Sequence, residues 1–429
     1  MTTSDPRPDN LPGISTKKSG LFYGWKLVGI SAFLLTLLSL TVFQGLGTFV
    51  VALQDKFGWS RTAISGAFSL ARVQGTIIGP FEGILIDRVG IRKMVLIGYS
   101  IMGTGFIMLS QVDSIWQFYL AFSVASIGAG VSGWLAMITL VNNWFIRKRT
   151  FAMAIAMSGI HFGGFLVPLL AFGIESKGFE YTTLVIGIFL LAIVVPSAKV
   201  IRNKPEDVGL LPDGSESVLT ENNTQLVSSG PEAEAETDFT LREALGTPAF
   251  WLLVLVQLSS SVSTVSLATH LVPKLTDIGM SLGNSAIVVL TSTVIAIPAQ
   301  LVVGYLADRI PKPPMIFLML TLQATSLVVI ALAGSVTTAY VFAVMYGIAF
   351  GGRMPLTTAI RGDYFGRKAF ATITGLSQVP NNIFTILAPL FAGYMFDRTG
   401  SYVIPFFTFA AMAYAGAVIV LFVHKPEHH

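Results

Sequence analysis

Cysteine does not occur among the 429 residues of this chain. Its absence excludes disulfide bonds, thiolate metal sites and cysteine nucleophiles. Charged residues are scarce as well, at 12% of the chain, whereas 53% of the residues are hydrophobic. A soluble globular protein carries about 25% charged residues. The composition therefore excludes an ordinary soluble fold and indicates a protein that crosses a membrane many times.

Twelve apolar runs are long enough to cross a hydrocarbon layer about 30 Å thick, which takes about 20 helical residues. The predicted fold class is therefore an all-α membrane protein with 12 transmembrane helices. The predicted spans are 25–52, 61–86, 94–112, 116–143, 151–172, 181–200, 248–273, 284–307, 315–335, 338–362, 370–394 and 402–423.

A short charged turn occurs twice in the chain. Gly83–Lys93 reads Gly-Ile-Leu-Ile-Asp-Arg-Val-Gly-Ile-Arg-Lys, and Gly304–Lys312 repeats it as Gly-Tyr-Leu-Ala-Asp-Arg-Ile-Pro-Lys. The glycine of a Gly-x-Ser sequence lies 29 residues before each aspartate, Asp87 and Asp308. The chain is therefore predicted to be a duplication with a period near 221 residues, folded as two pseudo-symmetric six-helix bundles.

Polar segments flank and separate these two bundles. The segment from Pro205 to Asp238 contains nine acidic residues and no basic one, so it is predicted to be solvated. Phe239 to Leu245 is predicted to form an interfacial helix. The predicted organisation is a cytosolic tail (1–20), the first bundle (21–200), an acidic cytosolic linker (201–247), the second bundle (248–423) and a short cytosolic tail (424–429).

Lysine and arginine are distributed unevenly between the two sides of the predicted spans. With the N-terminus in the cytosol, twenty lie on the cytosolic side and five outside, while Arg72 and Arg353 lie within spans. Cytosolic loops of membrane proteins carry the excess of basic residues. Both termini are therefore predicted to be cytoplasmic, which places the turn at Gly83–Lys93 in the cytosol.

This turn after the second of twelve helices, repeated after the eighth, resembles the signature of the major facilitator superfamily, and the resemblance covers the whole chain. Two further stretches, Arg202–Gly214 and Thr269–Ser281, are similar to its bacterial branch of monocarboxylate porters and oxalate/formate exchangers. The resemblance implies two bundles that rock about a site near the midplane of a bacterial inner membrane.

The charged turns are predicted to form a gate at the cytosolic side. A charge network at solvated helix ends costs little to break, so it can hold the two bundles together in one of two states. The alternative is that these residues are simply the basic loops that set membrane topology. The predicted gating residues are Asp87, Arg88, Arg92, Asp308 and Arg309.

Arg353 is the leading candidate for binding a ligand. At 1.5 Å per residue it lies about 15 Å from Asp363, close to the predicted midplane. Tyr346 and Phe350 precede it on the same helical face. A guanidinium binds a carboxylate through two hydrogen bonds, and aromatic rings can enclose the carbon skeleton of a small organic anion. The alternative is that Arg353 caps backbone carbonyls of a helix interrupted by Gly351, Gly352 and Pro355.

Five other polar residues complete the predicted substrate site: Arg72, His161, His270, Gln300 and Asn382. Arg72 and His161 are equally consistent with structural roles in helix packing. The similar branch commonly carries an arginine in helix eight, and Gln300 occupies that place here. Either Arg353 or Arg72 then supplies the positive charge, or the substrate is a neutral, zwitterionic or sulfonium-type solute.

Coupling to protons requires a group that can titrate, and the candidates are His270, His161 and Glu82. An exchanger would need none of them, because the substrate itself could neutralise Arg353 in both directions.

These observations predict a secondary active transporter of a small organic anion, a monocarboxylate carried by proton symport. An anion exchanger and a non-transporting solute sensor are the alternatives. The chain is predicted not to be an enzyme, since no nucleophile and base or metal cluster lie at one depth. The expected partners are the organic anion, protons and membrane lipid. A monomer is expected, without cofactor, metal or nucleic acid.

Overall fold

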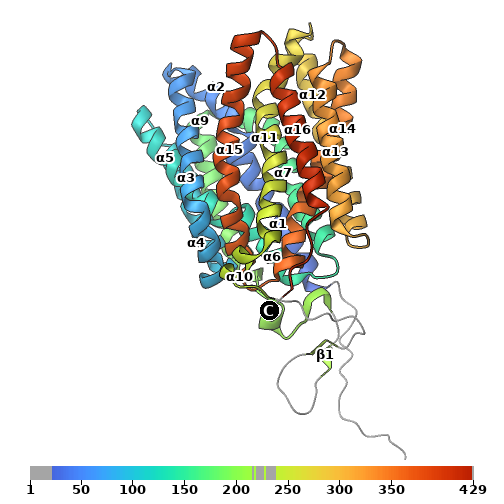
Figure 1. Ribbon diagram of the computed structural model, residues 1–429. Coiled ribbons are helices and arrows are strands. Elements are labelled where there is room, and N and C mark those ends of the chain that lie inside the picture. The colour runs from blue at the N-terminus through green and yellow to red at the C-terminus, as the bar shows by residue number, and fades with distance from the viewer. Residues whose placement is uncertain (1–21, 215–216, 219–226, 229–237, 428–429) are drawn as a thin grey trace, which may run out of the picture.

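Long parallel and antiparallel helices make up most of the described part of the molecule (Figure 1). The computed structural model describes residues 22–214, 217–218, 227–228 and 238–427. The predicted tail at 1–20 and the middle of the acidic linker lie outside this described part. The end of the molecule that carries the linker and the C-terminus is called the linker end below, and the opposite end is called the far end.

The first bundle contains ten helical segments, because three of its six predicted spans are interrupted. The first span is broken by the π-helix η1, the fourth at Gly133 and the fifth at Leu166, just before Pro168. The segments are α1 (Tyr23–Leu38), η1 (Ser39–Gln44), α2 (Leu46–Phe57), α3 (Arg61–Val89), α4 (Ile91–Leu109), α5 (Ile115–Ser132), α6 (Trp134–Trp144), α7 (Arg149–Phe165), α8 (Val167–Lys177) and α9 (Phe179–Val200).

The second bundle is built from longer, unbroken helices. The short helix predicted before it is present as α10. The segments are α10 (Leu241–Gly246), α11 (Pro248–Asp277), α12 (Leu282–Ala307), α13 (Lys312–Ala331), α14 (Val336–Phe365), α15 (Phe370–Thr399) and α16 (Val403–Val420).

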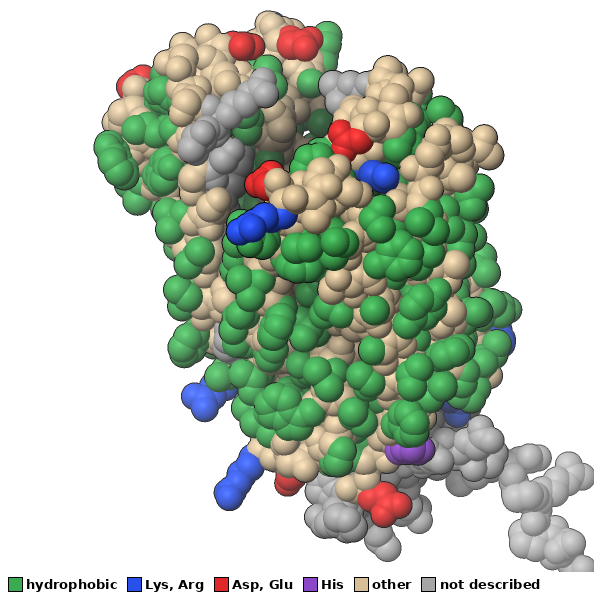
Figure 2. Space-filling model, turned by 45° about the horizontal axis from the view of Figure 1, so that its top comes forward, with side chains coloured by type: hydrophobic (Ala, Val, Ile, Leu, Met, Phe, Trp, Pro, Cys, Tyr) green, Lys and Arg blue, Asp and Glu red, His purple; other side chains and the backbone are tan. Residues whose placement is uncertain are grey.

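The predicted fold class is confirmed. In the part of the chain that the structure describes, 11 helical stretches are long and apolar enough to cross a membrane. The remaining predicted span, 61–86, coincides with α3, which is 29 residues long. Figure 2 shows hydrophobic side chains around the flank of the molecule, whereas charged side chains gather toward its two ends.

Each bundle has its own hydrophobic core. One cluster of buried side chains comes almost entirely from residues before 202, and two others come from residues after 238. The bundles meet where α3 packs on α15 and where α7 packs on α12 and α14. A site between them is therefore lined by helices that belong to different rigid units.

The linker is anchored at both of its ends. Asp213 accepts hydrogen bonds from the amides of Ile146 and Arg147, and Asp238 accepts them from the amides of Arg367 and Lys368. These two loops occupy equivalent places in the two bundles. The two ends of the linker therefore dock on the helix ends, while Glu206–Gly209 are exposed, as the prediction of a solvated linker expects. The elements of the linker are η2 (Glu206–Val208), η3 (Pro212–Gly214), β1 (Ser217–Val218) and β2 (Val227–Ser228).

Candidate functional site

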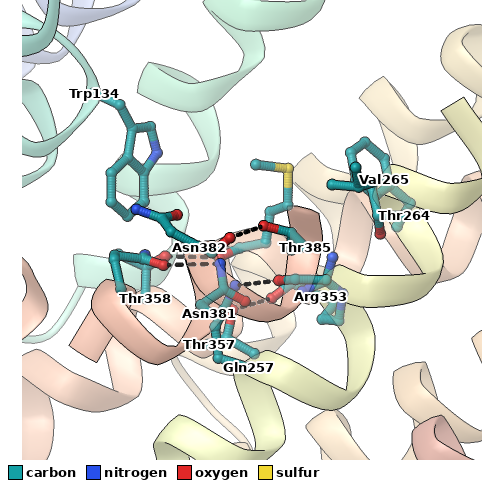
Figure 3. Close-up of a pocket in the computed structure, with 14 residues that line it drawn as sticks. Trp134, Gln257, Thr264, Val265, Arg353, Thr357, Thr358, Asn381, Asn382 and Thr385 are labelled. Atoms are coloured by element: carbon teal, nitrogen blue, oxygen red, sulfur yellow. Dashed lines mark hydrogen bonds between the residues drawn. The ribbon is translucent and has the colours of Figure 1, made fainter. Parts of the chain in front are cut away.

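A cavity of about 330 Å³ lies between the bundles and is lined mainly by α11, α14 and α15 of the second bundle (Figure 3). The first bundle contributes Trp134, the first residue of α6 after the break at Gly133. The indole Nε1 of Trp134 is buried and has no hydrogen-bond partner. A donor group from one bundle therefore faces a wall made by the other.

Arg353 lies in this cavity wall and is 3% exposed. Among the described residues, no acidic side chain pairs with its guanidinium, and its Nε atom has no hydrogen-bond partner. The predicted alternative, a cap on nearby backbone carbonyls, is not seen. A cation buried at membrane depth costs about 2.5 kcal/mol or more, so an unpaired one points to a ligand that carries the opposite charge.

Aromatic rings form a continuous stack beside Arg353. Its Cζ atom lies 5.9 Å from the ring centre of Phe350. Phe350 also lines the cavity, and it stacks at 5.7 Å on Tyr346, which stacks at 5.4 Å on Phe342. Phe350 is thus a wall of the cavity, while Tyr346 supports it from behind.

A polar face of α15 forms the wall near Arg353. Gln378, Asn381, Asn382 and Thr385 all line the cavity. Asn381 donates to Gln378 at 3.2 Å, whereas its own Oδ1 is buried without a partner. Asn382 was predicted from the sequence and the other three were not. Their spacing of three and four residues in an apolar helix is the signal that could have identified them.

Gln300 and His161 lie outside the cavity wall and link the two bundles. Gln300 on α12 is fully buried, and its Nε2 donates to the carbonyl of Ala154 on α7 at 2.6 Å. Its Oε1 lies 3.2 Å from Nε2 of His161. Because the amide nitrogen is already engaged, the oxygen accepts and His161 donates. The pair that was predicted to bind substrate instead joins α7 to α12 in this arrangement.

Two equivalent contacts tie the bundles together at the linker end. Asp87, near the end of α3, accepts hydrogen bonds from the amide and hydroxyl of Thr372 at 2.8 and 2.6 Å. Asp308, at the end of α12, accepts from the amides of Thr150 and Phe151 at 2.9 and 3.0 Å. Each carboxylate faces the N-terminus of a helix from the other bundle, where the helix dipole favours negative charge.

Burial raises the pKa of the Asp308 carboxyl above its ordinary value. The hydrogen bonds from α7 and the positive charge of Lys312 act in the opposite direction. Hydrogen bonds and a nearby positive charge therefore stabilise the ionised carboxylate, whereas the loss of its hydration destabilises it. Because these two effects oppose each other, the contact is easy to break.

A third contact at this end is an ion-pair cluster. Asp363 on α14 pairs with Arg149 of the first bundle at 2.7 Å and with Lys312 of its own bundle. The predicted gating residues Arg88 and Arg92 are exposed, and their side chains contact no acidic group in the described part of the chain. Arg309, just after the end of α12, donates to the carbonyl of Tyr305 in that helix.

The sequence as a whole matches a known family. The family model described as Major Facilitator Superfamily aligns with residues 32–299 and 266–429. The chain belongs to the major facilitator superfamily. It is therefore an integral membrane transporter, and the prediction that it is not an enzyme is confirmed by this membership.

Relatives of this superfamily member with curated names include several monocarboxylate transporters, mostly from animals. Monocarboxylate transporter 13 of Rattus norvegicus is 24% identical over 93% of this chain and 88% of its own length. The oxalate:formate antiporter of Oxalobacter formigenes is 27% identical over 73% of this chain and 71% of its own length. Among solved structures, the superfamily transporter FucP in its outward conformation superimposes with a TM-score of 0.71 at 13% identity. The superposition covers 94% of this chain and 99% of the FucP chain, and it confirms the fold.

Two of the remaining predicted residues, His270 and Glu82, lie away from the cavity. His270 is near the far end, where its ring nitrogens contact the Tyr402 hydroxyl at 3.3 Å and the Pro389 carbonyl at 3.0 Å. Glu82 lies on α3, and its Oε1 is buried without a hydrogen-bond partner. The side chain of Arg72 lies outside the described part of the structure.

A second arginine of α14 was overlooked in the sequence. The count of basic residues treated Arg361 as part of the cytosolic side, yet it lies within α14 and is 2% exposed. The reason is its position two residues before Asp363, at the edge of the predicted span 338–362. Charge near the end of a span does not reveal burial, because burial depends on the neighbouring helices.

Proposed function

We propose that this protein is a secondary active transporter of a small organic anion, a monocarboxylate, which it carries by alternating access. The observation that supports this most is the unpaired guanidinium of Arg353 in a cavity between the bundles. Its planar fork binds a carboxylate through two hydrogen bonds. Asn382 and the donor of Trp134 are placed to hydrogen-bond further polar atoms of the ligand.

The arrangement of the bundles fits one state of such a cycle. Contacts of Asp87, Asp308 and Asp363 tie the bundles together at the linker end. Figure 2 shows that the far end is hollowed between groups of helices. With the linker end in the cytosol, as the distribution of basic residues predicts, this is an outward-facing state in a bacterial inner membrane.

Proton symport is the proposed coupling, with His161 as the proton-binding group. His161 donates to Gln300 across the bundle interface. A change in its protonation alters a contact that must break during alternating access. His270 and Glu82 are the other candidates, but neither contacts the opposite bundle through a described hydrogen bond.

Exchange of two anions is the second candidate mechanism, and the relative named as an oxalate:formate antiporter favours it. The two mechanisms differ in what they require inside a vesicle. Uptake into proteoliposomes that depends on internal anion identifies an exchanger, whereas uptake driven by an inward proton gradient into empty vesicles identifies a symporter.

The binding proposal is tested with a panel of acetate, pyruvate, L-lactate, oxalate and benzoate, with the zwitterion glycine betaine and the neutral solute glycerol as comparisons without net charge. A ligand that binds the folded protein raises its melting temperature. We expect at least one carboxylate to do so, and Arg353→Gln to abolish both this shift and uptake. Arg202→Gln is the matched control, because Arg202 bonds only carbonyls near its own helix end. Transport that survives in Arg353→Gln, or a panel in which only the solutes without net charge bind, would refute the proposal.

A further inference from the structure

The cavity wall on α14 follows a single face of the helix. The five α14 residues of this wall are spaced by one, three and four positions, as neighbours on one helical face are. They are Phe350, Arg353, Met354, Thr357 and Thr358. The next residue on this face toward the linker end is Arg361, four positions after Thr357 and three after Thr358. The face of α14 that lines the cavity therefore continues into the contact between the bundles at the linker end.

The side chain of Arg361 turns back toward the cavity. Its Nη1 donates to the carbonyl oxygen of Thr357 at 2.7 Å, and this is the one hydrogen bond that the described residues provide to its guanidinium. The next residue, Gly362, lies against Asn142 and Arg149 of the first bundle. Arg361 is thus placed directly below the cavity, at the seam that must open when the linker ends part.

Arg361 also differs from the cations at the linker end that have acidic partners. Arg149 and Lys312 share Asp363, and Arg367 pairs with Glu206. Arg361 has no acidic partner among the described residues, although it is 2% exposed. An unpaired buried cation at membrane depth is retained when a function requires it. Along this face of α14, Arg353 and Arg361 are the two uncompensated positive charges.

We infer that Arg361 is a second anion-binding station, on the path by which the carboxylate leaves the cavity toward the linker end. The inference rests on the proposed function. The two arginines are about 12 Å apart along the axis of α14. In the tied arrangement, in which the bundles are in contact at the linker end, Arg361 is buried between the bundles and Arg353 holds the anion. When the contacts at the linker end break, Arg361 faces the opening path and attracts the departing carboxylate.

The first test compares the two sides of the membrane. Arg361→Gln and Arg361→Lys are reconstituted in one orientation, and transport of the panel carboxylate that stabilises the wild type most is measured from each side. For Arg361→Gln we expect the KM at the linker side to rise at least tenfold. The Kd measured from the far side should change less than twofold, because Arg353 is intact. Arg361→Lys should restore most of the loss, because it keeps the charge.

The control for this test is again Arg202→Gln, which also removes a bond from a guanidinium to a nearby backbone carbonyl, here that of Lys199 at the end of α9. It should leave both constants unchanged. If Arg361→Gln changed the KM at the linker side and the Kd from the far side by the same factor, the role of Arg361 would be merely structural. That result would overturn the inference of a second anion-binding station. If no carboxylate of the panel binds the wild type, the proposed function fails instead.

The second test needs no transported substrate. The chain contains no cysteine, so Thr358→Cys introduces a single reactive thiol in the cavity wall beside Arg361. Sealed vesicles are treated from the linker side with an anionic or a cationic methanethiosulfonate reagent. A positive charge on the path raises the local concentration of anions. We therefore expect the ratio of anionic to cationic labelling rates to fall at least about fivefold when Arg361→Gln is added. An unchanged ratio, or a thiol that never reacts from this side, would overturn the inference.

Discussion

Arg353 and Gln300 are both buried polar residues at similar depth, yet their surroundings give them different roles. Gln300 has partners on both atoms of its amide, whereas the guanidinium of Arg353 lacks an acidic partner among the described residues. A satisfied polar group strengthens the packing around it, while an unsatisfied one is costly unless a ligand completes it. In the proposed function, Arg353 on α14 supplies the positive charge that the similar branch carries in helix eight.

His161 provides a test of coupling at the scale of one residue. His161→Gln keeps a side-chain donor for Gln300 but cannot titrate near neutral pH. We expect uptake to lose its stimulation by acid on the far side, while the Kd for the carboxylate changes less than twofold. The rate of uptake as a function of pH measures this. Stimulation that persists in His161→Gln but disappears in Glu82→Gln would assign coupling to Glu82.

Glycine residues on α3 allow this helix to approach α15 closely. Gly75, Gly79 and Gly83 lie four residues apart on α3, a spacing of small residues that lets two helices approach closely. In the structure a Cβ atom at Gly83 would overlap the carbonyl of Ala371, whereas Gly75 and Gly79 have open space. The close approach is thus concentrated near the linker end.

Enlarging Gly83 should force α3 and α15 apart. For Gly83→Val we expect the population to shift toward molecules whose linker ends are separated. Cysteines introduced at the exposed positions Arg92 and Lys368, one in each bundle, carry spin labels whose distance reports this shift. Gly75→Val is the matched control and should leave the distance unchanged, since that glycine has free space. A Gly83→Val protein with the wild-type distance would contradict the tight contact.

At the scale of the whole molecule, two equivalent carboxylate contacts hold the bundles together at the linker end. They reflect the internal duplication, because Asp87 on the first bundle and Asp308 on the second each bind a helix N-terminus of the other. Neither lines the cavity. These residues should therefore govern the rate of conversion between states and not the affinity for substrate.

Asp87→Asn tests this separation of roles. The amide oxygen still accepts hydrogen bonds from Thr372, but the cost of burying an ionised carboxylate is removed, so the tied state is favoured. We expect a turnover several-fold lower than in the wild type and a Kd within twofold of it. The Kd is measured by binding of the panel carboxylate in detergent, and the turnover is measured by uptake into proteoliposomes. A large loss of affinity would instead place Asp87 at the binding site.

The raised pKa of Asp308 predicts a pH dependence of the same equilibrium. Because burial raises this pKa in the tied state, the tied state binds a proton more tightly than the parted state, whose carboxyl lies in water. Acid on the linker side therefore favours the tied state, and this preference is lost as the pH rises through the raised pKa. The spin-label distance should therefore lengthen as the pH on the linker side rises through the raised pKa of Asp308, and Asp308→Asn should weaken this response. An identical response in Asp308→Asn would assign it to another group.

Much of the architecture could be predicted because each membrane span can be recognised from its own residues. A run of apolar residues must be helical in a membrane whatever its neighbours are. The breaks at η1 and Gly133 were not predicted, because both segments remain apolar throughout. The docked part of the linker was also missed, since its acidic residues bind backbone amides that no sequence pattern reveals.

The sequence by itself determined the number of spans, the duplication and the family, and it placed the charge of Arg353 within an apolar run, because these are properties of single segments. Only the tertiary structure decided that Trp134 and Asn381 line the cavity, that Gln300 joins the bundles and that Arg361 is buried below the site. The rotation of a helix about its axis and its depth relative to its neighbours are set by packing between helices. The same polar residue can therefore face a ligand, a partner helix or the opposite bundle.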